Sequence, residues 1–315
     1  TRVALPADGG WATIGAYLEH RLSGISADEV GELFSGGRVL AGDGRPVAPG
    51  EAYAPGAVLW VDRPLADEVV VPFALEVLHE DDRIVVLDKP HFLATMPRGR
   101  HVAQSALARA RHSLGRADLA PAHRLDRLTA GVLLLTSDRR YRGAYQELFA
   151  SRRVSKTYLA VAAVRADVTL PRTVRNHLHK ERGRLQVDVV PDEDPNCATR
   201  VELLDRHPGP SGDVGLYRLT PTGGRTHQLR RHLSDLGIPI LGDPLYPTTV
   251  DVAPDDFSRP LQLLARRLAF VDPVDGRPRE FVSRRTLAGW AGAVPPAPPS
   301  WADHPRAAGA RPGLT

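Results

Sequence analysis

One carboxylate stands out as a group that could do chemistry. Asp126 lies in the run His123-Arg124-Leu125-Asp126-Arg127-Leu128-Thr129-Ala130-Gly131, directly before the apolar segment Val132–Leu135. The arginines at 124 and 127 would keep this carboxylate ionised, because a nearby opposite charge favours the charged form of an acid. An ionised carboxylate suits a nucleophile or a base. The alternative is a structural aspartate that caps the turn at Gly131.

A tyrosine lies in a second polar cluster, the segment Lys156-Thr157-Tyr158-Leu159-Ala160-Val161. Side chains alternate between the two faces of a strand, so Lys156 and Tyr158 share one face. A tyrosine in this setting could stack on a nucleobase and keep its hydroxyl near a reacting group. The alternative is ordinary half-buried packing of the ring.

A third cluster, Gly223–Leu233, predicts a short helix with the sequence GGRTHQLRRHL. Thr226 is a good residue to cap its start, and Gly237 stands where the chain would leave it. The leucines of this helix fall on one side, so we expect Arg230 to point away from the core. His227 and His232 are five residues apart, which is the wrong spacing for two metal ligands on one helical face.

No metal, cofactor or membrane is indicated by the remaining sequence. A single cysteine, Cys197, can form neither an intramolecular disulfide nor a thiolate zinc cluster. No glycine-rich phosphate loop, serine elbow or nicotinamide fingerprint is present, and no run approaches the roughly 20 apolar residues of a membrane helix. We therefore expect a soluble, cytoplasmic protein that acts as a monomer without a protein partner.

Positive charge is unevenly distributed and consists mostly of arginine. Only three of the 41 basic residues are lysines, and arginine is the better residue for phosphate contact and base stacking. Residues 1–66 hold five arginines against eight acidic residues, whereas the block from Arg139 to Arg184 holds 12 basic residues against three acidic ones. This block predicts a surface for a polyanion, with a solvated basic face as the alternative.

Four regions follow from the pattern of elements. Residues 1–66 predict two helices, around Ile14–Leu22 and Ala27–Phe34, and a strand at Val58–Val61. This order of elements resembles the S4 RNA-binding module. The excess of acidic over basic residues in this region argues against strong RNA binding by it. Residues 67–72 read as a linker, and 291–315 as a disordered tail rich in proline and alanine. Between them, residues 73–290 form the main domain.

The main domain predicts a mixture of strands and helices. Apolar runs typical of strands occur at Ile84–Leu87, Val132–Leu135, Tyr158–Val164 and Leu216–Leu219. Between the second and third of these, Ser137 or Asp138 could cap an amphipathic helix whose aromatic residues face the core. The predicted fold class is α+β.

The three clusters together resemble the RluA-type pseudouridine synthases. The His-Arg-Leu-Asp run at 123–126 is similar to the catalytic motif of that family, and Lys156–Ala160 to its tyrosine motif. Gly224–Arg230, followed by Gly237–Asp243, is similar to the third motif, and Asp88-Lys89-Pro90 to the first. The resemblance spans residues 75–287 in the expected order.

This resemblance implies a catalytic domain with a mixed, largely antiparallel sheet and a cofactor-free isomerisation of uridine to pseudouridine in structured rRNA or tRNA. It gives Asp126 the role of the essential carboxylate, Tyr158 that of the ring on the uracil, and Arg230 that of the arginine paired with the aspartate. Arg124 would fill the space left by a flipped nucleotide. Phe92, Ala130 and Leu264 stand where the family commonly has glycine, serine and histidine.

We expect the RNA to be held by a set of cationic or imidazole side chains, namely Arg124, Arg127, Lys156, Arg225, His227, Arg152 and Arg153. Two other functions remain open at this point. One is an RNA-binding protein of the same fold that does no chemistry. The other is a nucleoside or glycoside hydrolase, which would need a second carboxylate near Asp126.

Overall fold

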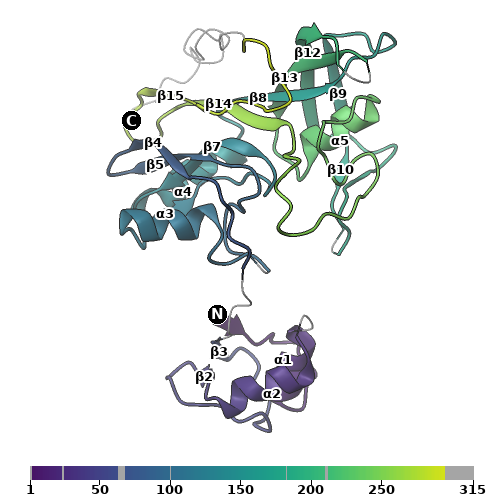
Figure 1. The fold of residues 1–315 in the computed structure, drawn as a ribbon. Helices are drawn as coiled ribbons and strands as arrows, with labels where there is room; N and C mark the ends of the chain where they lie inside the picture. Colours follow the sequence, from purple (N-terminus) through teal and green to yellow (C-terminus); the bar gives the residue numbers. More distant parts are fainter. Residues whose placement is uncertain are drawn as a thin grey trace. The chain divides into compact units, whose positions relative to one another are not determined.

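The computed structural model describes residues 2–22, 25–62, 68–99, 101–181, 183–209 and 212–294. The chain divides into two compact units, Thr1–Asp67 and Glu68–Thr315 (Figure 1). The predicted tail falls almost wholly outside the described residues, which end at Val294, and the first residue of the predicted linker also falls outside them. No helix among the described residues is long and apolar enough to cross a membrane.

The first unit packs two helices against a small antiparallel sheet with the strand order β1-β3-β2. Its helix α2 starts at a capping box, in which the Ser26 hydroxyl accepts from the Glu29 amide and the Glu29 carboxylate accepts from the Ser26 amide. The predicted helices and strand are therefore present. The elements are α1 (Ile14–Arg21), α2 (Ala27–Ser35), β1 (Arg2–Ala4), β2 (Val39–Ala41) and β3 (Val58–Val61).

The second unit is built on a sheet of ten strands in the order β4-β5-β7-β14-β8-β13-β12-β9, with β15 paired to β14 and β6 to β7. Every pairing in this sheet is antiparallel except the short contact between β7 and β14. The predicted α+β class with a mixed, largely antiparallel sheet is thus confirmed.

The strands of the large sheet are β4 (Glu76–Glu80), β5 (Ile84–Lys89), β6 (Ala120–Pro121), β7 (Ala130–Thr136), β8 (Val154–Ala163), β9 (Arg172–Asn176), β12 (Cys197–His207), β13 (Val214–Thr222), β14 (Leu263–Val271) and β15 (Pro278–Val282). A separate hairpin consists of β10 (Leu178–His179) and β11 (Asp188–Val189). The helices are α3 (Ala106–Leu114), α4 (Arg139–Ala150) and α5 (Gln228–Asp235).

The neighbouring strands β5 and β7 are buried along their whole length because a helix covers each face of the sheet there. Val85 and Leu87 pack in one apolar cluster with residues of α3, whereas Ile84 and Val86 pack in another with residues of α4. Burial on both faces explains why these strands read as continuous apolar runs rather than alternating ones. As predicted, α4 begins after Asp138, whose carboxylate accepts from the Arg140 amide.

The parallel contact between β7 and β14 requires a glycine. Gly131 has a φ of +112° and pairs with Ala265, and a Cβ at this position would collide with the Ala265 backbone. The loop that holds Asp126 therefore enters β7 at a point where the two strands approach closely. This junction fixes the end of the loop against the centre of the sheet.

Candidate active site

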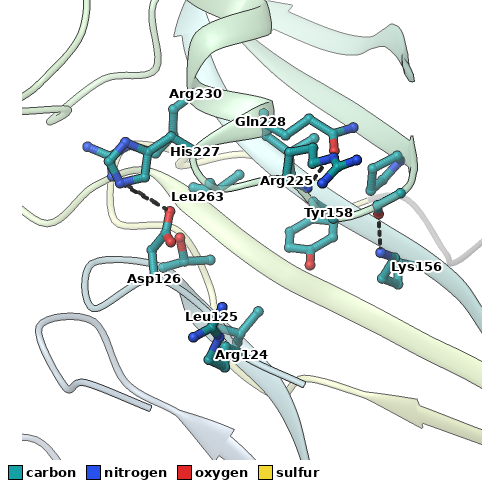
Figure 2. Close-up of a pocket in the computed structure, with 15 residues that line it drawn as sticks. Arg124, Leu125, Asp126, Lys156, Tyr158, Arg225, His227, Gln228, Arg230 and Leu263 are labelled. Atoms are coloured by element: carbon teal, nitrogen blue, oxygen red, sulfur yellow. Dashed lines mark hydrogen bonds and ion pairs between the residues drawn. The ribbon is translucent and has the colours of Figure 1, made fainter. Parts of the chain in front are cut away.

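The three polar clusters of the sequence meet in one pocket of about 90 Å³. Its walls come from the loop before β7, from β8, and from the residues that lead into α5 (Figure 2). Among the predicted residues, the lining includes Arg124, Asp126, Lys156, Tyr158, Arg225, His227 and Arg230. Among the residues that the structure describes, no group of three or more His, Cys, Asp or Glu side chains could hold a metal ion.

Hydrogen bonds from Thr95 and Lys89 hold the backbone of the loop around Asp126. The Thr95 hydroxyl donates to the Leu125 carbonyl at 2.7 Å and accepts from the Leu125 amide at 3.1 Å. On the other side of Asp126, the Lys89 ammonium donates to the Arg127 carbonyl at 3.2 Å and to two further carbonyls. These contacts hold the backbone on both sides of Asp126, so its carboxylate faces the pocket (Figure 2).

Lys89 is fully buried, and its burial lowers the pKa of the ammonium to about 7. The negative charge of Asp126 opposes this shift. Lys89 belongs to a segment that resembles a family motif, and the sequence alone predicted no task for it. The structure assigns it the support of the Asp126 loop, which could have been inferred only from the contact between β5 and that loop.

Arg230 lies 3.7 Å from Asp126, measured from Nη1 to Oδ2. Its other two nitrogens donate to Asp243, Nε to Oδ2 at 2.7 Å and Nη2 to Oδ1 at 2.6 Å. The side chain of Arg230 is only 2% exposed and that of Asp243 is fully buried. The expectation that Arg230 points away from the core is therefore wrong, because a buried carboxylate on the following loop balances its charge.

The start of α5 also differs from the prediction. The residue that precedes the helix is His227, with a φ of +52° and no capping hydrogen bond from its side chain, rather than Thr226. Instead, the Gln228 side chain accepts from the Arg225 amide and donates to the Ala198 carbonyl in β12. The helix is thus anchored to the sheet by its first residue, and His227 is turned into the pocket.

His227 lies between Asp126 and Tyr246. Its Nδ1 is 3.1 Å from the Tyr246 hydroxyl, and its Nε2 is 4.0 Å from Asp126 Oδ2. Burial lowers the pKa of the imidazole, the negative charge of Asp126 opposes this shift, and the positive charge of Arg230 adds to it. From the sequence we expected His227 to bind RNA, and in the structure it lies directly beside the central carboxylate.

Tyr158 and Lys156 line the same pocket, as expected from their shared strand face. Burial raises the pKa of the Tyr158 hydroxyl, and the negative charge of Asp126 raises it further, so this hydroxyl is neutral at physiological pH. The Lys156 ammonium donates to the Gly223 carbonyl. Burial lowers its pKa to about 8, and the charge of Arg152 contributes.

The other predicted arginines lie around the pocket or outside it. Arg124 and Arg225 are exposed residues of the lining. Arg152 and Arg153 are exposed residues that follow α4 and do not line the pocket, although the charge of Arg152 reaches Lys156. Arg127 lines a neighbouring cavity of about 220 Å³ that also touches Asp243.

The three departures from the family pattern are buried. Phe92 has a φ of +65°, which explains why a glycine suits this position. The centroid of its ring lies 5.2 Å from that of the Phe257 ring and 6.0 Å from that of the Phe73 ring. This packing offsets the cost of the backbone conformation. Ala130 and Leu264 pair across the contact between β7 and β14.

Comparisons with known proteins agree with this site. Residues 83–235 match the family described as RNA pseudouridylate synthase. The dual-specificity RNA pseudouridine synthase RluA of Pasteurella multocida is 31% identical over 213 residues, which cover 64% of this chain and 88% of that protein. The mitochondrial tRNA pseudouridine(32) synthase of Saccharomyces cerevisiae is 30% identical over 175 residues, 55% of this chain and 37% of that protein.

The fold has a solved counterpart as well. Human RNA pseudouridylate synthase domain containing 1 superposes with a TM-score of 0.54 at 22% identity, over 67% of this chain and 84% of that one. The matched sequence contains the Asp126 loop, the Tyr158 strand and the start of α5, which together form the pocket. The chain therefore belongs to the RluA-type family of RNA pseudouridine synthases, enzymes that isomerise uridine in RNA.

Proposed function

We propose that Asp126 is the catalytic carboxylate and that the target is a uridine in structured rRNA or tRNA. The observation that supports this most directly is the placement of Asp126: its side chain is 32% exposed and lines the pocket together with Tyr158, and the Arg230 guanidinium lies 3.7 Å behind it. A reactive carboxylate needs such partial exposure. The guanidinium behind it gives the carboxylate a cationic partner on the side away from the substrate.

The reaction balances without an added reagent. The bond between uracil N1 and ribose C1′ breaks, the base turns, and a bond forms between C5 and C1′. The C5 proton is lost and N1 gains a proton, so no electrons are exchanged with a cofactor. In this proposal Asp126 starts the cleavage and Tyr158 packs on the uracil ring. Because the Tyr158 hydroxyl stays neutral, it does not act as a phenolate base; it relays the C5 proton by accepting it while its own hydroxyl proton passes to water.

A buried second carboxylate does not favour the hydrolase alternative. Asp243 is the acidic residue on the far side of Arg230, and it is fully buried and bonded to that guanidinium through both of its oxygens. Its side chain does not line the pocket that contains Asp126. The pocket thus offers one reactive carboxylate rather than the flanking pair of a glycosidase.

RNA binding in this proposal centres on the catalytic unit. The target uridine must leave its stack, which costs a few kcal/mol and is offset by stacking on Tyr158 and by phosphate contacts. Arg124, Lys156 and Arg225 line the pocket, and Arg152 and Arg153 extend the positive charge beyond it. The acidic unit at residues 1–66, which resembles an S4 module, would contribute to site selection more than to affinity. The enzyme would act as a cytoplasmic monomer without cofactor or protein partner.

The test is the Asp126→Asn variant. We expect it to lose isomerisation and to remain folded, because Arg230 keeps its buried partner Asp243 and a partly exposed charge contact contributes only about 0–1 kcal/mol. Tritium release from RNA labelled at uracil C5 measures turnover, and a binding titration measures RNA affinity. Turnover by the variant would contradict the role of Asp126. Wild-type protein that binds RNA without tritium release would favour the silent RNA-binding alternative, and release of free uracil would favour a hydrolase.

A further inference from the structure

A chain of polar contacts runs from the protein interior to Asp126 through His227. The Val187 amide lies 2.8 Å from the Tyr246 hydroxyl oxygen, which lies 3.1 Å from His227 Nδ1. The opposite nitrogen of the ring, Nε2, lies 4.0 Å from Asp126 Oδ2. Figure 2 shows the His227 ring next to Arg230, on the same side of the pocket as the Asp126 carboxylate.

The direction of each hydrogen bond in this chain follows from the donors. A backbone amide can only donate, so the Tyr246 oxygen accepts from Val187 and its own hydrogen is free for His227. Nδ1 must then be the unprotonated, accepting nitrogen, which leaves the ring proton on Nε2. With the opposite tautomer, the Tyr246 hydroxyl hydrogen would lack an acceptor among the described residues, in a side chain only 2% exposed.

Burial and the surrounding charges together favour the neutral form of the ring. His227 faces the carboxylates of Asp126 and Asp243 and the cations of Arg230 and Lys180. Burial and the two cations together lower the pKa of the imidazole more than the two carboxylates raise it. A neutral ring presents an N–H dipole to Asp126, which attracts the carboxylate without binding it as tightly as a second cation would.

We propose that His227 is a positioning residue for Asp126, with its neutral imidazole held by Tyr246 in the tautomer that aims Nε2–H at the carboxylate. The inference rests on the proposed function of Asp126. The separation of 4.0 Å fits a site without substrate, since catalytic hydrogen bonds often tighten only in the complex. The left-handed backbone of His227 supports the same role, because strained conformations persist where the surrounding contacts require them.

Two substitutions of His227 separate positioning from packing. In His227→Gln the side-chain amide reaches the place of Nε2 and can still donate to Asp126. In His227→Asn the amide reaches only the place of Nδ1, although asparagine tolerates the left-handed backbone better. We expect the Asn variant to lose about tenfold or more in kcat, with KM nearly unchanged, and the Gln variant to recover most of that loss. Gln as poor as Asn would overturn the proposal.

Tyr246→Phe tests the tautomer while it keeps the aromatic ring. Removal of the hydroxyl frees Nδ1, and equal tautomer populations would reduce the productive form, and with it kcat, by about twofold. Two-dimensional NMR of protein labelled with ¹⁵N-histidine reports the tautomer directly, with the His227 signal identified by its loss in His227→Gln. We expect Nε2–H in the wild type and a mixture in Tyr246→Phe. An Nδ1–H signal in the wild type would overturn the proposal.

The control variant is His112→Gln, at an exposed position in the last turn of α3, for which we expect wild-type kcat and KM. The outcome for Asp126→Asn distinguishes the two hypotheses. If that variant is inactive while the His227 and Tyr246 variants keep the wild-type kcat, only the positioning role fails. If Asp126→Asn turns over, the proposed function fails first.

Discussion

The buried ion pair between Arg230 and Asp243 makes a sharp prediction for Asp243→Asn. Oδ1 of Asp243 accepts from Arg230 Nη2 and from the Leu245 and Tyr246 amides, and Oδ2 accepts from Arg230 Nε. Asparagine can keep the first set of contacts with its amide oxygen. Its NH₂ group then faces Arg230 Nε, so two donors oppose each other and the guanidinium loses its neutralising charge.

The expected cost follows from this geometry. Removing one partner of a buried ion pair costs about 3–5 kcal/mol, and the contacts retained by asparagine place the loss near 3 kcal/mol. The guanidinium would be drawn toward the other carboxylate, Asp126, now 3.7 Å from Nη1. Tight pairing would make Asp126 less reactive. We expect kcat to fall about 10- to 100-fold, which corresponds to about 1.4–2.7 kcal/mol.

Chemical denaturation measures the loss of stability, and tritium release from RNA labelled at uracil C5 measures kcat. Asp167→Asn is the matched control, because Asp167 makes the same two-pronged contact with Arg165, at 2.9 and 2.6 Å, with both side chains more than half exposed. That variant should lose less than about 1 kcal/mol and keep its activity. Equal losses of stability in the two variants, or full activity of Asp243→Asn, would refute the reasoning.

Three other predictions concern the same pocket, the RNA surface and acid stability. Arg230→Ala should lose most activity and Arg230→Lys should recover only part of it, because lysine lacks the planar fork; wild-type rates in both would contradict a role for Arg230. If Arg152 contacts a phosphate, Arg152→Glu should reduce the slope of log affinity for RNA against log salt concentration by at least about 0.7. Deletion of residues 1–66 should leave the non-specific RNA affinity unchanged. The reverse pattern in a titration at several salt concentrations would place the RNA surface on residues 1–66 instead. Burial lowers the pKa of three histidines besides His227, so the folded state excludes protons that the unfolded state binds. Stability present above about pH 6.5 should therefore be lost on acidification, by up to about 4 kcal/mol per pH unit near pH 5 in denaturation curves. A slope that stays flat between pH 6.5 and 5 would contradict this. The three are His91, His123 and His232, with pKa values lowered to about 4, 3 and 4.

Much of the secondary structure depends on residues that are close together in the sequence, so the sequence by itself predicted it. The helix expected around Ala27–Phe34, the helix after Asp138 and the apolar runs of β5 and β7 each depend on residues within a few positions of one another. The presence of Asp126, Tyr158 and Arg230 in one site also followed from the sequence, through the order of the family motifs. The inferences about the elements needed residue type and spacing alone, and the one about the site also needed the resemblance to the family.

The electrostatics of the site were decided only by the tertiary structure. Helical periodicity placed Arg230 on the outer face, whereas its buried position depends on Asp243, 13 residues further along the chain. Likewise, capping preferences selected Thr226, but His227 takes the position before the helix and turns its ring toward Tyr246. The burial of a side chain and the balance of its charge both depend on groups that the fold brings together from distant segments of the chain. Spacing along the chain predicts which side chains can react, and the packed structure sets their charge, their partners and their orientation.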